Sequence, residues 1–561
     1  MSKTLTVPNT ILLEFDLFSL PTAQHKAGLA GLLLMIRSME ARKLPVVPEI
    51  KKLDSYSASI EFSKESIQAL FDDLYDALWV EVESKAKWKD KVPKREISKE
   101  IVVSENKTKN QKYFIYDAVQ AKGAFLAALY PDGDGVWVKL WRDMLWSTLR
   151  GIPLTRLDYE RRAKNEPASI GDDIWKSLVK WNADKDKEYL ESLSSAIFIG
   201  AQDKNSEKVS FQGEVSQNIL LHFWTLTSLI FVPQKISIDG KKEYAGYVLT
   251  VPEPVDLEMF IDELKSTFGK MECAMSGYRP KACLIDVPEE GGLEYLYDLT
   301  FDRIEKNDIK YSLTSVEFYH LEKQGNNIRL LSTDRIIPNS NTISLYSEIR
   351  RKYFNPLFKS MILRNLLSGE AWFNGMLTVF NNYPWEFFVF QKSKAQLRPF
   401  FSSDAKRYFR KIQEEIKLKG GSVTMSDKDR ENLLAQRVYR IIQSYVRYKT
   451  EVKSGIKYDQ FSQSKDANGR VNYPPKYLEA REKVCSDAFL AMRGRREQDF
   501  VEYFTGTICS VPQFLPENDY LEIASSLMNE PEKVKTLAML AVSAASYSGE
   551  NKNKENNSEE N

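Results

Sequence analysis

Residues 17–40 read LFSLPTAQHKAGLAGLLLMIRSME, and this stretch decides how the start of the chain folds. It follows an extended run, Thr10–Phe15, that ends at Leu20-Pro21. Thr22 can cap the first free backbone amides of a helix, and the leucines that follow recur at helical spacing. The sequence therefore predicts a strand that leads directly into a helix of the hydrophobic core.

Two glycines and a histidine in this helix need an explanation. Gly28 and Gly31 lower helix propensity, which a fold tolerates where another backbone approaches closely. His25 lies on the same side as Leu29 and Ile36, and no cluster of catalytic partners accompanies it. We predict close backbone packing at the glycines and a buried, hydrogen-bonded histidine rather than a catalytic one.

Length and composition limit the class of protein. The chain has 561 residues, more than one core usually holds, so we expect two or three domains. Its 79 basic and 78 acidic residues nearly cancel, so a nucleic-acid site depends on local charge. We expect a reduced cytoplasm, because no signal peptide precedes the first strand and the cysteines lack metal-ligand spacing. These cysteines are Cys273, Cys283, Cys485 and Cys509.

The first two-thirds of the chain mixes strand and helix patterns. Residues 55–62 alternate as a strand, and Ile67–Leu78 has helical spacing behind a cap at Ser63. Residues 169–193 and 217–231 are predicted helices. The second of these is apolar but shorter than the roughly 20 residues of a membrane span, so we interpret it as a core helix.

The strand patterns stop near residue 343. Asn355 as cap, Pro356 at the first helical position and Gly369 just past the end define one helix of the following region. The predicted fold class is α+β, with a mixed α/β N-terminal two-thirds followed by an all-α helical bundle. We predict a body over 1–342, a helical connector over 343–424, a bundle over 425–548 and a disordered tail over 549–561.

A Lys-rich segment lies within a predicted hairpin. Alternating runs at Ile97–Val103 and Tyr113–Val119 flank KTKNQK, residues 107–112, which we place at the tip. This tip is a candidate for nucleic-acid contact. The alternative is an ordinary solvated loop, since charge runs often have no partner. The candidate side chains are Lys107, Lys109, Asn110 and Lys112.

A cluster of four arginines surrounds a predicted helix end at Gly151 and Pro153. Each planar guanidinium can bind two phosphate oxygens at once, which suits contact with nucleic acid. The arginines can equally pair with Asp143, Asp158 and Glu160. The four are Arg150, Arg156, Arg161 and Arg162.

The helical region contains the clearest charge asymmetry. Residues 403–500 hold 22 Lys and Arg against 14 Asp and Glu, whereas the rest of the chain after them holds 4 against 10. Within this part Arg437, Arg440 and Arg447 project in a narrow arc beside an apolar face. Such a stripe is typical of a surface that follows a phosphate backbone, and the alternative is a solvated face. A second cluster consists of Arg493, Arg495 and Arg496.

Motifs of catalysis are absent from the sequence. It contains no GxxxxGK[ST], HExxH or GxSxG motif and no cysteine-histidine zinc grouping. Carboxylate pairs such as Asp72-Asp73 and Glu289-Glu290 are adjacent in sequence and diverge on a helix. We expect no catalytic residue, no metal site and no cofactor. The alternative is a metal nuclease assembled from distant carboxylates, which leaves no local motif.

Four segments resemble one protein family. They are PTAQHKAGLAGLL (21–33), LRGIPLTRLDYERR (149–162), GYRPKACLIDVPEEGG (277–292) and RGRREQDFVEYFTGTICSVP (493–512). Together they resemble the large subunit of type I-B CRISPR Cascade complexes, the Cas-eight family, in its myxobacterial and cyanobacterial branch.

The resemblance implies a non-catalytic subunit of an RNA-guided antiviral complex. It implies contact with the guide RNA (crRNA), recognition of a short protospacer-adjacent motif (PAM) in double-stranded DNA, help in forming the R-loop, and recruitment of a helicase-nuclease or transposition factor. The implied partners include the Cascade backbone and handle-capping subunits. The resemblance implies no contact with a membrane. Arg279 and Lys281, in the GYRPK turn, join KTKNQK as candidates for PAM contact. A stand-alone RNA- or single-stranded-DNA-binding protein is the other alternative.

The resemblance also implies a second product of the same gene. Related type I-B systems obtain a small subunit by starting translation inside the large-subunit gene, and Met425 is a suitable start. Codons for Lys419–Gly421 can spell a purine-rich ribosome-binding site, although the same glycines also end a predicted helix. We predict a short product that begins at Met425.

Overall fold

The computed structural model divides the chain into two compact units, each described here by itself. Unit 1 comprises Met1–Pro233 and Ala245–Ser340, and unit 2 comprises Gln234–Tyr244 and Asn341–Asn561. Strands and helices alternate in unit 1, while unit 2 is mainly helical, which confirms the α+β class. The structure describes residues 8–88, 91–104, 107–145, 149, 153–183, 189–201, 210–276, 279–304, 311–324, 327–391, 400–419, 426–464, 471–512 and 516–548.

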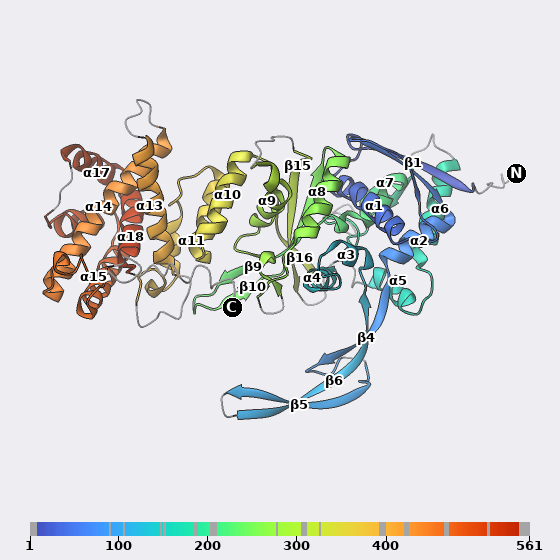
Figure 1. Ribbon diagram of the computed structural model, residues 1–561, viewed down its shortest axis with the longest axis horizontal. Coiled ribbons are helices and arrows are strands. Elements are labelled where there is room, and N and C mark those ends of the chain that lie inside the picture. Colours follow the sequence, from blue (N-terminus) through green and yellow to red (C-terminus); the bar gives the residue numbers. More distant parts are fainter. Residues whose placement is uncertain are drawn as a thin grey trace. The chain divides into compact units, whose positions relative to one another are not determined.

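Unit 1 is organised around α1 (Ala23–Ala41), the helix that the opening stretch predicts. The strand β1 (Thr10–Asp16) precedes it, and the Thr22 hydroxyl accepts a hydrogen bond from the His25 amide, as expected of a cap. The helix is buried on nearly all sides, and Figure 1 shows it among the other elements of unit 1. The predicted strand-to-helix entry is therefore confirmed.

The glycines of α1 allow a close approach between backbones. A Cβ atom on Gly28 would lie 2.2 Å from the Leu220 carbonyl oxygen, and one on Gly31 would lie 2.2 Å from that of Phe223. His25 is buried, with Nδ1 2.8 Å from the Thr22 hydroxyl, and burial lowers the pKa of this histidine to about 4. Both predictions for this helix, the close packing and the buried histidine, are confirmed.

The segment that packs on α1 differs from its prediction. Instead of one helix over 217–231, the chain forms α7 (Val215–Asn218), two 3-10 turns (Ile219–His222 and Trp224–Leu226) and strand β9 (Ile230–Ile236). The segment is buried all along, so its apolar residues carry no periodicity that distinguishes helix from strand. The predicted helix over 169–193 is also shorter, because α6 ends at Ala183.

A small antiparallel sheet lies beside α1, with strand order β1-β3-β2. Its other strands are β2 (Glu49–Leu53) and β3 (Ser57–Ser63). Ser63 then caps α2 (Lys64–Leu74) through a capping box with Ser66. The predicted strand and helix cap are confirmed, but α2 ends at Leu74, and Leu78, which the spacing placed in the helix, lies in strand β4 (Ala77–Ser84).

A larger sheet has the order β10-β9-β11-β15-β16, and β14 pairs with β9 in parallel. The helix α9 (Glu290–Ile304) approaches Val248 and Thr250 of β11, whereas α1 binds Glu253 on the opposite face through Lys26. The short β10 and the last three residues of β9 belong to unit 2. The strand bounds are β10 (Lys242–Tyr244), β11 (Tyr247–Pro254), β14 (Leu284–Ile285), β15 (Leu313–Gln324) and β16 (Asn327–Ile336).

Short helices and strands complete unit 1. The PDGDG segment at 131–135 is a turn, and the Asp132 carboxylate accepts a hydrogen bond from the Val136 amide at the start of α4. The remaining elements are α3 (Ala124–Leu129), α4 (Val136–Met144), α5 (Pro153–Ala163), α6 (Ser169–Ala183), β7 (Leu190–Ser192), β8 (Gln212–Glu214), α8 (Leu257–Lys270), β12 (Met275–Ser276) and β13 (Arg279–Pro280).

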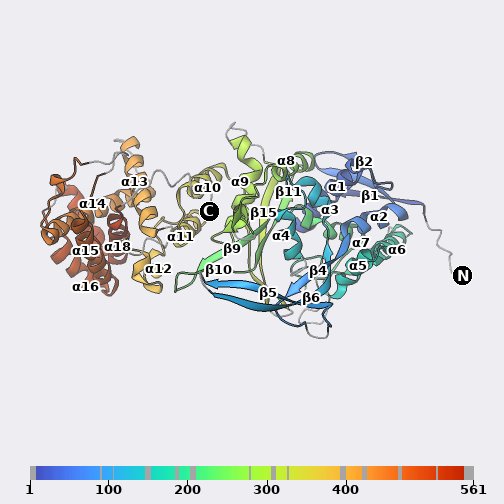
Figure 2. The ribbon, with the colours of Figure 1, turned by 60° about the horizontal axis from the view of Figure 1, so that its bottom comes forward.

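Unit 2 is organised around α18 (Pro531–Ser546), in which every residue from Val534 to Ser546 is buried. It packs against α13 (Phe401–Lys419), α14 (Asp427–Ser454) and α15 (Pro475–Arg493), as Figure 2 shows. Its other elements are α10 (Ser340–Lys352), α11 (Pro356–Ser368), α12 (Met376–Asn382), α16 (Glu497–Tyr503), a π-helical turn (Phe504–Ile508) and α17 (Glu517–Asn529).

The helix ends of unit 2 follow the sequence signals. The Asn355 side chain caps α11, Pro356 occupies its first turn, and Gly369 adopts the left-handed conformation (φ 67°) at its end, as predicted. Met425 and the tail 549–561 lie outside the described residues, so the predicted start of the bundle at 425 stays a prediction.

Candidate nucleic-acid interface

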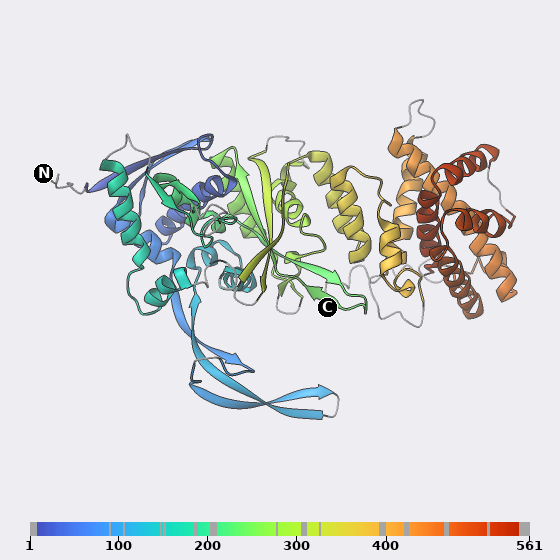
Figure 3. The ribbon, with the colours of Figure 1, turned by 180° about the vertical axis from the view of Figure 1, so that it is seen from behind.

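A three-stranded ribbon leaves the helices of unit 1 and extends away from them (Figures 1 and 3). Its strands are β4 (Ala77–Ser84), β5 (Arg95–Ser104) and β6 (Lys107–Ala121), in the order β4-β6-β5. The pair Ala77 and Ala121 marks its base, where α5 packs against β4 and β6. Beyond Phe114, β6 pairs only with β5 among the described residues, so the outer part of the ribbon is two-stranded. A two-stranded ribbon fits the major groove of duplex DNA.

The cations in the middle of the ribbon are already paired. Arg95 lies 2.6 Å from Glu81, Lys99 lies 2.6 Å from Glu83, and Lys94 lies 3.0 Å from Glu81. These cross-strand pairs neutralise one face of the ribbon. These paired cations are therefore less available to a ligand than an unpaired one.

The predicted hairpin is confirmed, but KTKNQK does not form its turn. Residues 107–112 are the first part of β6, because the ladder continues from β5 and pairs Glu100 with Asn110. Asn110 and Lys112 are exposed, and Lys112 has no ion pair within the described ranges. The side chains of Lys107 and Lys109 lie outside what the structure describes.

Two of the four clustered arginines hold the fold together. Arg161 Nε donates to the Pro167 carbonyl (2.7 Å), and Arg162 donates to the carbonyls of Asp72 (3.1 Å) and Glu166 (3.0 Å). These bonds close the loop after α5 and tie it to α2. Arg161 and Arg162 thus bind groups within the protein, as the alternative interpretation expected. Their partners are these carbonyls and not Asp143, Asp158 or Glu160. Arg150 lies outside the described residues, and Arg156 is exposed on α5.

The GYRPK segment contributes one small antiparallel pair, β12 with β13. Arg279, in β13, lies near Asp143 of α4 and opposes the rise in the pKa of that carboxyl that burial causes. Lys281 follows in a 3-10 turn and is half-buried. The charge of Arg279 is therefore partly compensated. Residues 277 and 278 lie outside the described part.

The prediction of one exposed stripe on α14 is wrong for Arg437. This side chain is buried, with Nε 2.5 Å from Asp519 Oδ1 and a second ion pair to Glu522. Both carboxylates belong to α17, which packs across this part of α14. The arc of arginines exists, but a helix more than 80 residues later covers its first member.

The other two arginines of the stripe are more accessible. Arg447 lies 3.0 Å from Glu451 and 2.8 Å from Asp459, and it is half-exposed. Arg440 is exposed and has no side-chain hydrogen bond or ion pair among the described residues. Arg440 is therefore the member of the stripe best placed to meet a phosphate.

The turn between α15 and α16 presents the second arginine cluster. Lys535 of α18 donates to the carbonyls of Arg493 and Arg495 and so holds the turn against α18. Arg493 also donates to the Asn381 carbonyl (2.6 Å), and Arg495 lies 4.4 Å from the centre of the Tyr503 ring. Arg496 is exposed, with no such partner within the described residues.

An aromatic cluster that sequence reasoning missed adjoins Arg447. Arg447 lies 4.7 Å from the ring centre of Tyr458, and Arg481 of α15 lies 5.5 Å from that of Tyr473. The tyrosine-rich composition of residues 458–477 was the available signal. Rings interleaved with cations are what unpaired bases stack on. The cluster consists of Tyr458, Phe461, Tyr473 and Tyr477. Phe461 and Tyr477 are buried, so the half-buried rings of Tyr458 and Tyr473 are the ones that a base can reach.

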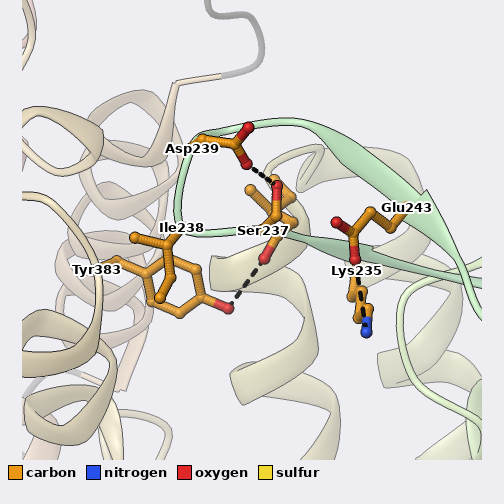
Figure 4. A pocket seen from close by; sticks show the side chains of 7 residues that line it. Lys235, Ser237, Ile238, Asp239, Glu243 and Tyr383 are labelled. Carbon is orange, nitrogen blue, oxygen red and sulfur yellow. Dashed lines mark hydrogen bonds and ion pairs between the residues drawn. The ribbon is translucent and has the colours of Figure 1, made fainter.

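A 700 Å³ cavity of unit 2 lies between the β9–β10 hairpin and Tyr383 (Figure 4). Tyr383 donates to the Ile236 carbonyl (3.1 Å), and Ser237 donates to Asp239. Lys235 faces Glu243 at 3.5 Å. The polar groups that line this cavity thus bind one another. No pattern in the sequence indicated that this hairpin belongs to the helical unit.

The described residues contain no group of three or more His, Cys, Asp or Glu side chains placed to hold a metal ion. Within the same residues, no helix has both the length and the apolar character to span a bilayer.

Comparison with known families matches regions that contain three of the four resembling segments, while the segment 21–33 lies before the matched residues. A model of the type I-B CRISPR Cas8b N-terminal domain matches residues 47–308, and one of the Cas8b C-terminal domain matches residues 313–545. These matches cover most of the chain in the expected order, as in a large subunit of a type I-B CRISPR complex. The chain belongs to the Cas8b family. No curated protein matches it.

Proposed function

We propose that this chain is the non-catalytic large subunit of a type I-B Cascade complex that recognises the PAM in double-stranded DNA, supports R-loop formation and recruits a helicase-nuclease or transposition factor. The observation that carries this proposal is the ordered match of both Cas8b models. The proposed partners are the guide RNA, the target DNA and the backbone and handle-capping subunits.

We assign duplex contact to unit 1. The outer part of its ribbon is two-stranded, which the major groove admits, and Asn110 and Lys112 are exposed there. Arg156 on α5, which packs at the base of the ribbon, is the second candidate. Arg161 and Arg162 are excluded from this interface because they bond the carbonyls that hold the loop after α5.

We assign contact with separated strands to unit 2. Arg440 and Arg496 are exposed, and the aromatic cluster offers rings for stacking near Arg447. Affinity for a single strand comes mainly from charge neutralisation and base stacking, so this surface needs no base-specific contacts.

The test is reconstitution of the complex with guide RNA and the other subunits, with and without this chain. We expect the complete complex to bind duplex target with the correct PAM and to bind a PAM-mutated duplex much more weakly. Without the chain, binding to single-stranded target should persist while binding to duplex is lost. PAM-dependent duplex binding that survives omission of the chain would overturn the proposal.

Two controls separate the alternatives. Strong binding of RNA or single-stranded DNA by the isolated chain, with no effect of guide-bearing partners, would favour a stand-alone binding protein. DNA cleavage by the purified chain that disappears with a chelator would favour a carboxylate nuclease.

We also propose that a short product begins at Met425. Mass spectrometry of the purified complex should detect it, and synonymous recoding of Lys419–Gly421 should reduce its amount. Because α13 packs on both α14 and α18, a product that lacks α13 would expose apolar surface of α18. We therefore expect it to be stable only when another subunit covers that surface. Absence of any short product would end this part of the proposal.

A further inference from the structure

The helix α17 brings negative charge onto the basic part of unit 2. It contains Glu517, Asp519 and Glu522 and no basic residue. Two of these carboxylates meet at one guanidinium, that of Arg437. The Asp519 side chain is 14% exposed and that of Glu522 is 59% exposed, so one edge of this pair is open to solvent.

Few apolar contacts hold α17 in place. Of its side chains, only Ile523 and Leu527 are buried. Leu521 and Met528 are 62% and 74% exposed. In α18, by contrast, every residue from Val534 onward is buried. An element with so few buried contacts is among those that open most easily.

The two carboxylates occupy Arg437 in the way a phosphate would. A guanidinium presents a planar fork of donors, and its usual partners are the paired oxygens of a carboxylate or a phosphate. Arg440 lies three residues further along α14, on a neighbouring position of the same helix face, and it is exposed. If α17 moves away, Arg437 and Arg440 become adjacent free cations on one surface.

We propose that Arg437 and Arg440 form a phosphate-binding site for an unpaired nucleic-acid strand, and that Asp519 and Glu522 of α17 occupy this site until the strand displaces them. The inference rests on the proposed function of unit 2 as a surface for separated strands. It adds a binding residue that is hidden in the free chain and a reason for the acidic character of α17. The exchange replaces two carboxylates by strand phosphates at the same guanidinium.

The first experiment measures binding of a fluorescent 20-nucleotide oligo-dT to the full chain over a range of salt concentrations. The variant Asp519→Asn with Glu522→Gln should bind severalfold more tightly than the wild type at low salt. Its plot of log K against log salt should keep the wild-type slope, because the strand contacts Arg437 in both complexes and the variant removes only the cost of displacing the carboxylates. Glu517→Gln is the matched control, because Glu517 is an exposed carboxylate of the same helix.

The gain should depend on Arg437. Adding Arg437→Gln to the double variant should abolish the gain in affinity and flatten the salt slope by about 0.7, the value for one lost phosphate contact on a single strand. One outcome would overturn this inference and leave the proposed function standing. In that outcome the double variant binds like the wild type, while Arg440→Gln still weakens binding by the wild type. Failure of every form to bind the oligonucleotide would overturn the inference together with the strand-binding role of unit 2.

A second measurement uses the wild-type chain alone, so it does not depend on how the variants fold. Hydrogen exchange should show that saturating oligo-dT lowers the protection of α17 amides and leaves those of α18 unchanged. Unchanged or increased protection of α17 in the bound state would overturn the proposed displacement.

Discussion

Arg162 of unit 1 and Arg440 of unit 2 lie in similarly basic stretches, yet the folded chain uses them differently. Arg162 donates to the carbonyls of Asp72 and Glu166, and its side chain is 22% exposed. Arg440 is exposed and without such a partner among the described residues. A cation that satisfies backbone carbonyls stabilises the fold, whereas an exposed cation without a partner is available to a ligand. Local charge counts therefore indicate where cations are, and the fold decides which of them can bind.

The largest effect should come from breaking the structural member of this comparison. Arg162→Ala removes charged hydrogen bonds to two carbonyls, so the free energy of unfolding should fall by about 2–3 kcal/mol. Lys164→Ala, an exposed neighbour in the same loop, should change it by less than about 0.5 kcal/mol. Urea unfolding of the purified chain measures both. Equal effects of the two substitutions would mean that the Arg162 bonds contribute nothing.

The second effect concerns the accessible cations. Arg440→Gln combined with Arg496→Gln should flatten the salt dependence of single-strand binding by about 1.4 in slope, at about 0.7 for each lost phosphate contact. The unfolding midpoint should stay at the wild-type value. Salt-titrated binding of an oligonucleotide checks the first statement, and urea unfolding checks the second. A shifted unfolding midpoint with an unchanged salt slope of binding would mean that both arginines stabilise the fold and do not contact the strand.

A smaller effect is expected in the ribbon. Lys112→Gln should reduce the salt slope of duplex binding by about 0.9, the value for one phosphate contact on double-stranded DNA. Lys99→Gln is the control, because Lys99 already pairs with Glu83. The assembled complex with a PAM-bearing duplex is the system to measure. If Lys99→Gln reduces the slope as much as Lys112→Gln does, then an ion pair within the ribbon does not prevent a lysine from binding a DNA phosphate.

The smallest effect concerns a cation of a third kind, which is buried at a helix end. Lys406 donates to the Tyr547 carbonyl (3.0 Å) just beyond α18, and burial, with Arg481 and Arg410 nearby, lowers the pKa of Lys406 to about 7. Between pH 7 and about 10 the unfolded chain then holds a proton at this lysine that the folded chain has lost.

The free energy of unfolding should therefore rise across this range, by at most about 1.4 kcal/mol per pH unit for this group. Lys406→Met should remove the rise. Urea unfolding at pH 7 and pH 9, for the wild type and the variant, measures the difference. An identical pH dependence of the two proteins would show that Lys406 keeps its proton in the folded state.

The sequence alone predicted the features that depend on neighbours along the chain. The caps at Thr22, Ser63 and Asn355 each act on an amide within three residues, so their signals are local. The α+β class and the family followed from patterns of similar range. Gly28 and Gly31 also indicated a close approach of another backbone, because such an approach offsets the cost of glycine in a helix.

Only the tertiary structure decided which segments and charges meet. It placed the backbone of residues 219–226 against α1 as 3-10 turns, where burial on all sides had erased any periodicity. It also assigned the β9–β10 hairpin to the helical unit. Arg437 gained partners 82 and 85 residues away, which no helical wheel of α14 contains. An ion pair depends on distance in space, so the arc of arginines on one helix could not show which of them another helix covers.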